Sequence, residues 1–120
     1  MIINFTQHKA TEDQIAAGVI DPIPVDVRNG ILTFNEIPTY SDIRSRAHEA
    51  AIIISKVAEK GDKVMIGGAS FFMGALESAL KEVDLVPVYA FSERVSVDTI
   101  QPDGSVIKTS KFVHKGFVEV

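Results

Sequence analysis

Cysteine is absent from the 120 residues of this chain. Its absence excludes a disulfide framework, a thiolate metal site and a thiol nucleophile. Long apolar runs are absent too: the longest, residues 50–54, is about a quarter of the roughly 20 residues that span a bilayer. Residues 1–5 lack the basic leader and small-residue cleavage site of a signal peptide, so we expect no membrane association and a cytoplasmic location.

An excess of positive charge is also lacking. The 12 Lys and Arg residues are outnumbered by 16 Asp and Glu residues, which gives a formal net charge of −4. Broad binding to duplex nucleic acid needs a basic stripe, so the sequence predicts no such partner. Scattered histidines, and aspartates in expected turns and caps, predict no metal site and no other cofactor. A small anionic ligand held by a few local donors is compatible with this charge.

The composition and periodicity indicate one α/β domain over residues 1–120. Hydrophobic residues make up 46% and charged residues 23%, as in ordinary globular proteins. Apolar side chains recur at helical spacing in residues 43–57 and again in residues 72–83. Short apolar runs at residues 2–6, 63–66 and 85–91 are typical of strands. Strands that alternate with helices at this spacing predict parallel βαβ units.

Several local signals set the expected helix ends. Thr11 with Gln14, and Thr39 with Asp42, have the spacing of capping boxes, and Gly18 suits a left-handed helix stop. Residues 19–38 give mixed signals and are left unassigned, apart from an expected turn at Asn29-Gly30.

The end of the chain has a different pattern. Residues 95–100 and 106–109 flank Pro102-Asp103-Gly104, a turn suited to a hairpin. We therefore expect residues 95–120 to form a β-rich, antiparallel extension. The predicted fold is a Rossmann-like, mostly parallel sheet flanked by helices, with a C-terminal β-hairpin.

The strongest candidate for ligand binding is Gly67-Gly68-Ala69-Ser70, between an expected strand and an expected helix. Glycines let backbone amides approach a ligand, and the helix directs unpaired amides and its positive dipole end to the same place. A phosphate or a ribose would suit such a turn. The residues match neither the dinucleotide fingerprint nor a P-loop. A tight turn with a packing role only is the alternative.

Two further groups follow expected strands. Phe91, Ser92 and Arg94 follow the apolar run of residues 85–91, and ligands of open parallel sheets bind beyond the carboxyl ends of the strands. Arg94 could pair with a phosphate while Ser92 donates its hydroxyl, or both could lie in a solvated loop.

Thr6, Gln7 and His8 follow the first expected strand, so the same rule places them at the same edge of the sheet. His8 could act as a general acid or base, or contact a nucleobase. A partly exposed histidine at a strand end is the alternative.

The motifs have a recognisable order. They comprise residues 5–14, Gly61-Asp62 before a short strand, the glycine turn, residues 86–89 leading to Ser92 and Arg94, residues 102–106, and residues 112–117. In this order the chain resembles the small CRISPR-associated ring-nuclease proteins, relatives of the CARF nucleotide-sensing domains. The resemblance covers both ends of the chain and not residues 19–58.

The resemblance implies a Rossmann-like homodimer that encloses a cyclic oligoadenylate across its two-fold axis. It also implies metal-independent cleavage, in which a ribose 2′-hydroxyl attacks the adjacent phosphate. Carried over by position, Ser92 and Arg94 would hold phosphate, Gly68 and Ser70 would offer amides and a hydroxyl, and His8 would line the pocket.

Three functions follow from these features. The first is a ring nuclease or related phosphodiesterase that uses His8, Ser70, Ser92 and Arg94. The second is a module that binds or sequesters a nucleotide messenger without cutting it, for example a phage-type modulator of defence. The third is a structural or partner-binding domain in which the glycine turn holds no ligand.

Overall fold

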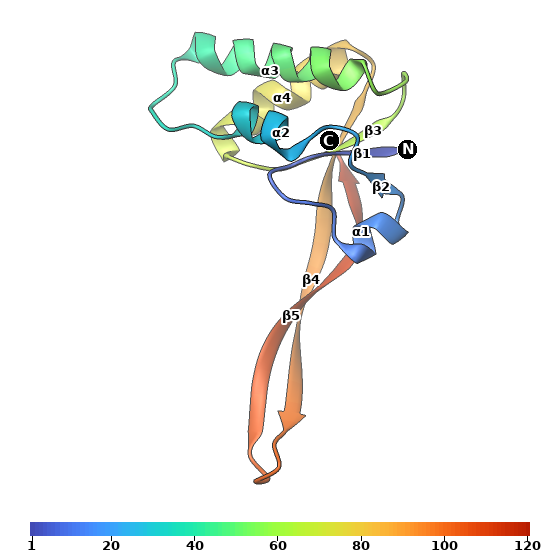
Figure 1. Ribbon diagram of the computed structural model, residues 1–120, viewed down its shortest axis with the longest axis vertical. Helices are drawn as coiled ribbons and strands as arrows, with labels where there is room; N and C mark the ends of the chain where they lie inside the picture. Colours follow the sequence, from blue (N-terminus) through green and yellow to red (C-terminus); the bar gives the residue numbers. More distant parts are fainter.

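The computed structural model describes residues 1–120 and contains one five-stranded sheet with four helices (Figure 1). Its elements, in chain order, are β1 (Ile2–Phe5), α1 (Glu12–Ala16), β2 (Val19–Ile20), α2 (Val25–Leu32), α3 (Tyr40–Ser55), β3 (Lys63–Ile66), α4 (Ser70–Glu82), β4 (Val86–Ile100) and β5 (Val106–Glu119). None of the helices combines the length and the apolar character needed to cross a membrane.

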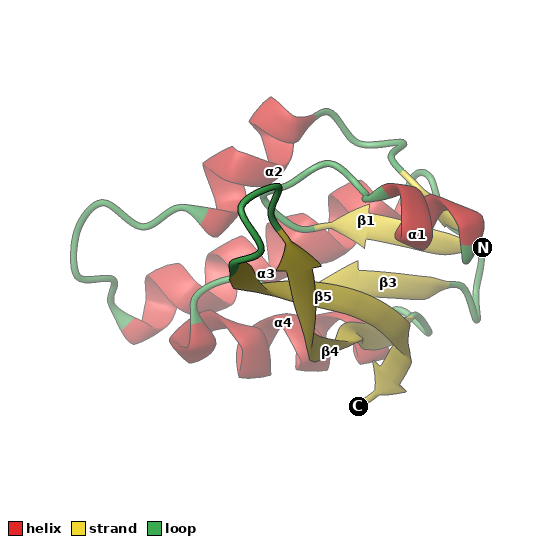
Figure 2. Cartoon of the chain, turned by 90° about the horizontal axis from the view of Figure 1, so that it is seen from below, coloured by secondary structure: helices red, strands yellow, loops and turns green.

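The sheet has the strand order β2-β1-β3-β4-β5. The first four strands are parallel, and β5 is antiparallel to β4. The chain steps to one side from β1 to β2, and to the other side from β2 to β3 and from β3 to β4. Since such crossovers are right-handed, α1 lies on one face of the sheet and α2, α3 and α4 lie on the other (Figures 1 and 2). The predicted α/β fold with a C-terminal hairpin is confirmed.

The main core lies between the sheet and the three longer helices. Ile3 and Phe5 of β1 and Val64 and Ile66 of β3 point to this side and are buried. The helices contribute buried residues at the helical spacing seen in the sequence: Ala47, Ala50, Ile54, Phe72, Leu76 and Leu80. A smaller cluster of Val19, Met65 and Val88 covers the opposite face.

Both predicted capping boxes are present. The Thr11 hydroxyl accepts from the Gln14 amide while the Gln14 side chain accepts from the Thr11 amide, and Thr39 with Asp42 does the same at the start of α3. The hydrogen bonds from Thr39 lower the pKa of Asp42. Gly18, with φ of 102°, follows α1 as expected.

Residues 19–38, which the sequence left unassigned, contain β2 and α2. The prediction of a turn at Asn29-Gly30 is wrong. Both residues lie inside α2, which begins after Pro24. Burial of Arg28, Ile31 and Leu32 on one side of the helix outweighs the turn preference of Asn-Gly.

The strand expected at residues 85–91 does not end there. β4 continues to Ile100 and pairs with β5 along almost its whole length, around the expected turn at Pro102-Asp103-Gly104. The β-rich extension predicted at residues 95–120 is therefore β5 with the outer part of β4. A register shift between Phe91 and Ser92 marks where the hairpin leaves the sheet. We call residues 92–114 the arm; it gives the molecule its length of 58 Å (Figure 1).

Candidate functional site

A cleft of about 500 Å³ lies at the carboxyl ends of β1 and β3. The chain leaves these adjacent strands toward opposite faces of the sheet, so the cleft is at the topological switch point, where open α/β sheets bind their ligands. Its lining residues come from four parts of the chain: Thr6, Gln7, His8 and Lys9; Thr11 and Gln14; Met65, Ile66, Gly67 and Gly68; Tyr89 and Ala90.

The cleft unites part of the predicted site. Thr6, Gln7 and His8, which follow β1, lie across it from Gly67 and Gly68, which follow β3. Ligand-binding residues expected from two strand ends thus share one hollow.

The remaining predicted residues do not line the cleft. Ala69 precedes α4 as its N-cap residue and Ser70 begins the helix, both just beyond the cleft. Phe91, Ser92 and Arg94 were expected at a strand end, but they lie within β4, where Arg94 is opposite Phe112 of β5. The prediction of a loop after residue 91 is wrong because β5 supplies hydrogen-bond partners that let β4 continue.

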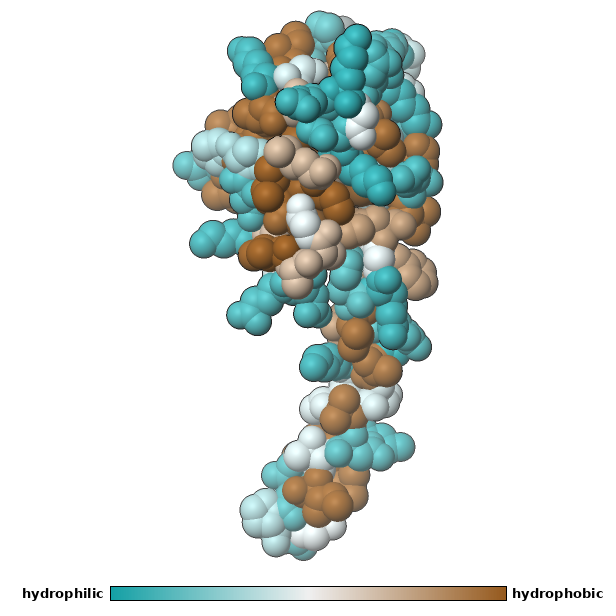
Figure 3. Space-filling model, turned by 90° about the vertical axis from the view of Figure 1, so that its right-hand side faces the viewer, coloured by the Kyte–Doolittle hydropathy of each residue, from teal (hydrophilic) through white to brown (hydrophobic).

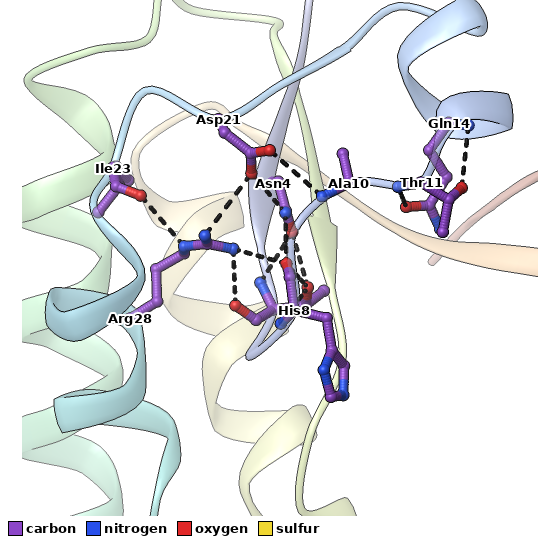
Figure 4. A network of polar contacts seen from close by, with 9 residues as sticks. Asn4, His8, Ala10, Thr11, Gln14, Asp21, Ile23 and Arg28 are labelled. Atoms are coloured by element: carbon purple, nitrogen blue, oxygen red, sulfur yellow. Dashed lines mark hydrogen bonds and ion pairs between the residues drawn. The ribbon is translucent and has the colours of Figure 1, made fainter.

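A buried polar network shapes the segment between β1 and α1. Asn4 is fully buried in β1, and its amide nitrogen donates to the His8 carbonyl at 2.8 Å and to Asp21 at 2.6 Å (Figure 4). Its amide oxygen accepts from the Thr6 amide at 3.0 Å and from the Thr6 hydroxyl at 2.7 Å. Asn4 therefore folds the chain after β1 back on itself.

Arg28 of α2 completes this network. Its side chain is only 2% exposed, and one terminal nitrogen donates to the carbonyls of Thr6 and His8 at 2.8 and 3.0 Å. Its Nε donates to the Ile23 carbonyl, and its other terminal nitrogen lies 3.7 Å from Asp21. Because the His8 carbonyl faces Asn4 and Arg28, the His8 imidazole points away from the network (Figure 4).

Sequence reasoning missed Asn4, Asp21 and Arg28. Asn4 had one visible signal, since a polar residue inside an apolar strand needs buried partners. Arg28 and Asp21 lay in the unassigned segment, and nothing local links them to the first strand.

The glycine turn brings the backbone close to its surroundings. Gly68 has φ of 151°, and a Cβ atom there would lie 3.5 Å from the Met73 methyl carbon and 3.7 Å from a Leu32 methyl carbon. The helix that follows, α4, has no side-chain cap on its first amides. The Phe72 amide donates to the Ala69 carbonyl at 3.0 Å. The amides that precede it have no partner within the helix and are therefore available to a ligand next to Gly68.

Tyr89 closes the cleft on the β4 side. Its hydroxyl donates to a carboxylate oxygen of Glu77 in α4 at 2.7 Å. Burial, with this hydrogen bond and the charge of Glu77, raises the pKa of Tyr89 well above that of free tyrosine. Tyr89 is therefore a neutral donor already engaged by Glu77, and it acts as a wall of the cleft.

The charge of the cleft differs from that of the whole chain. The chain has 16 acidic residues, yet no carboxylate is among the lining residues of the cleft. Lys9 and His8 line it, together with the hydroxyls and amides of Thr6, Thr11, Gln7 and Gln14. The cleft therefore offers hydrogen-bond donors and a cation to an anionic ligand.

A comparison with protein families gives one result. A family model matches residues 1–118. The chain belongs to the Uncharacterized protein MJ1673 family. No curated protein and no solved structure is significantly similar to it. The match to the MJ1673 family spans every strand and helix except the last residue of β5, so the cleft and the arm both belong to the matched region.

The network around Arg28 leads to a prediction about stability. Arg28→Ala removes three hydrogen bonds, to the carbonyls of Thr6, His8 and Ile23, and the contact with Asp21, so we expect the free energy of unfolding to fall by about 3 kcal/mol. Arg44→Ala, at an exposed position of α3, should change it by less than about 0.5 kcal/mol. Urea denaturation measures both values, and equal losses would contradict the role of Arg28.

Alanine at Gly68 and alanine at Gly74 should change the stability of the protein in opposite directions. Gly68→Ala forces a side chain into a left-handed backbone, so we expect a loss of about 1–2 kcal/mol of stability. Gly74→Ala, inside α4 with open space around it, should add about 1 kcal/mol. Urea denaturation of the two variants tests this, and a stabilising Gly68→Ala would refute the strain at the turn.

Tyr89 predicts a distinct ionisation at high pH. In a Tyr40→Phe variant only Tyr89 absorbs as a phenolate, because the chain has two tyrosines. We expect its absorbance to titrate well above pH 10, and Glu77→Gln to lower that midpoint. Tyr89 of the unfolded chain ionises at about pH 10, below the pKa of Tyr89 in the folded chain. The stability that Tyr89 contributes below about pH 10 is therefore lost as the pH rises. A Glu77→Gln variant with an unchanged midpoint would argue against the contact.

Proposed function

We propose that the protein binds a phosphate-bearing nucleotide in the cleft between the ends of β1 and β3. One observation carries the proposal: an acidic chain lines its switch-point cleft with Lys9, His8 and two glycines, and with no carboxylate. A volume of about 500 Å³ falls within the roughly 300–1,000 Å³ of ordinary small-molecule sites.

Each part of the cleft has a chemical role in this proposal. The amides of the glycine turn and of the start of α4 donate hydrogen bonds to the phosphate, with Lys9 as the counter-charge. The Gln7 side-chain oxygen accepts from the sugar or the base, since the Gln7 amide nitrogen donates to Thr33 and the Thr6 hydroxyl to Asn4. The hydrogen bonds from Arg28 to the Thr6 and His8 carbonyls fix this backbone before the ligand binds. This lowers the entropic cost of binding.

A cyclic oligoadenylate is the ligand that we propose, on the strength of the resemblance to the ring-nuclease proteins. One nucleotide of such a ring would occupy the cleft, and the others would extend beyond its open rim. The resemblance assigned phosphate contacts to Ser92 and Arg94, but neither residue lines the cleft, so we assign the phosphate contact to Lys9.

Cleavage of the ring is a second candidate function, favoured by the position of His8. Its imidazole makes none of the hydrogen bonds of the network and lines the cleft. In such a reaction a ribose 2′-hydroxyl attacks the adjacent phosphorus and gives up its proton, and the 5′-oxygen leaves and takes up a proton. A histidine can serve either proton transfer near neutral pH.

Calorimetric titration tests the binding proposal with cyclic tetra-adenylate, AMP and inorganic phosphate. We expect a nucleotide to bind, and Lys9→Ala to weaken its binding by about tenfold, as for loss of one charged hydrogen bond. Arg94→Ala is the matched control and should change the affinity by less than about twofold, because Arg94 lies on the arm. Absence of binding by every nucleotide, or a loss with Arg94→Ala alone, would reject the cleft as the site.

Chromatography of the same mixtures separates binding from cleavage. Linear products that disappear with His8→Ala, while binding persists, would support the ring nuclease. An intact ring that stays bound would support sequestration.

A further inference from the structure

The loop between α2 and α3 forms a second hollow, separate from the cleft. This hollow has a volume of about 640 Å³ and is lined by residues 34–38 of the loop, with Ile43 of α3 and Phe71 of α4. We call it the aromatic hollow, because Phe34 and Phe71 both line it. The loop lies at the same edge of the sheet as the carboxyl ends of β1 and β3 (Figure 2). The aromatic hollow and the cleft therefore share one end of the molecule.

A hydrogen bond and a short stretch of chain connect the cleft to the aromatic hollow. Gln7 lines the cleft and donates to the Thr33 hydroxyl at 2.9 Å, and the next residue, Phe34, lines the hollow. Gly68 lines the cleft and Phe71 lines the hollow, and three residue steps span at most about 11 Å. Two nucleotides joined by one phosphodiester can cover this distance. A ligand of two nucleotides can therefore reach both sites at once.

Phe71 presents a fixed aromatic ring to the hollow. It is 54% exposed, and its ring packs edge-on against Phe34 with 5.0 Å between the ring centroids. Phe34 is held in turn by Arg46, whose guanidinium lies 4.2 Å from the Phe34 ring centroid and donates to the Thr33 carbonyl. An exposed aromatic ring held in place in this way is a surface on which a nucleobase stacks.

We propose that the aromatic hollow binds the base of a second nucleotide, one with an exocyclic amino group such as adenine, when the first nucleotide occupies the cleft. The proposal rests on the function proposed for the cleft. Charge separates the roles of the two sites: Lys9 and no carboxylate line the cleft, whereas Glu36 and neither lysine nor arginine line the hollow. The Glu36 carboxylate repels a phosphate, so the cleft takes the phosphate and the hollow takes a base.

The polar residues of the hollow favour a base that carries an amino group. Asn35 and Glu36 are both exposed and both line the hollow. Carboxylates accept hydrogen bonds from the amino groups of bases, and asparagine amides pair with the amino group and N7 of adenine. Phe71 stacks on the face of the base, while Asn35 or Glu36 binds its edge. A volume of about 640 Å³ is within the roughly 300–1,000 Å³ of small-molecule sites.

Calorimetric titration of the full chain with linear diadenylate and with AMP tests the second site. We expect diadenylate to bind about tenfold more tightly than AMP, as for the gain of one base–aromatic stack. Phe71→Ala should weaken the binding of diadenylate by about tenfold and that of AMP by less than about twofold. Phe71→Tyr keeps a ring and should retain the tight binding. Phe112→Ala is the matched control and should change neither affinity, because Phe112 is on the arm, which projects clear of the rest of the molecule (Figure 3).

The outcomes separate this inference from the function proposed for the cleft. Equal affinities of AMP and diadenylate, or equal losses of both with Phe71→Ala, would overturn the second site while the cleft remains a nucleotide site. Absence of binding by both ligands would reject the two proposals together. Phe71→Leu keeps an apolar side chain without the ring, so it should lower the diadenylate affinity even where the alanine variant fails to fold.

Linear di-inosinate tests the role of the amino group, because hypoxanthine carries an oxo group in its place. We expect the wild-type protein to prefer diadenylate over di-inosinate by about tenfold, as for one hydrogen-bonded base contact. Glu36→Gln should remove most of this preference, since a glutamine amide donates to an oxo group as well as accepting from an amino group. A wild-type protein without the preference, or a preference that Glu36→Gln leaves unchanged, would overturn the assignment of an amino-bearing base to the hollow.

Discussion

The buried guanidinium of Arg28 is the interaction on which the candidate site depends. It donates to the carbonyls of two residues in the segment after β1, and in this way turns that segment inward beneath the cleft. An arginine 2% exposed costs free energy to desolvate, and only its full set of carbonyl and carboxylate partners offsets that cost. The side chains of Thr6, Gln7 and His8 line the cleft because the backbone beneath them is held by these bonds.

Local patterns in the sequence were sufficient for most of the parallel sheet. The helical periodicity of residues 43–57 and 72–83, the two capping boxes and the glycine turn each depend on neighbours within a few residues, and each is present in the structure. The sequence also predicted which edge of the sheet would hold the site, because the carboxyl ends of parallel strands meet at one edge.

Long-range pairing explains what the sequence could not reveal. The ionic partner of Arg28 is seven residues earlier in the chain, and the carbonyls of Thr6 and His8 that it binds are 22 and 20 residues earlier, so no local spacing shows the network. β4 continues past Phe91 because β5, which comes later in the chain, pairs with it. Polar residues such as Ser92 and Arg94 look like a strand end when that partner is unknown. α2 likewise forms through Asn29-Gly30 because its other side is buried.

The network of Asn4, Asp21 and Arg28 also constrains how this protein can evolve. Each of the three side chains bonds to at least one of the others, or to a backbone oxygen that another also holds. A change at Asn4 or Arg28 removes one of the two side chains that contact both Asp21 and the His8 carbonyl, so the remaining members hold the chain less well. Positions 4, 21 and 28 should therefore be inherited as a block, and relatives that replace one of them should differ at the others as well.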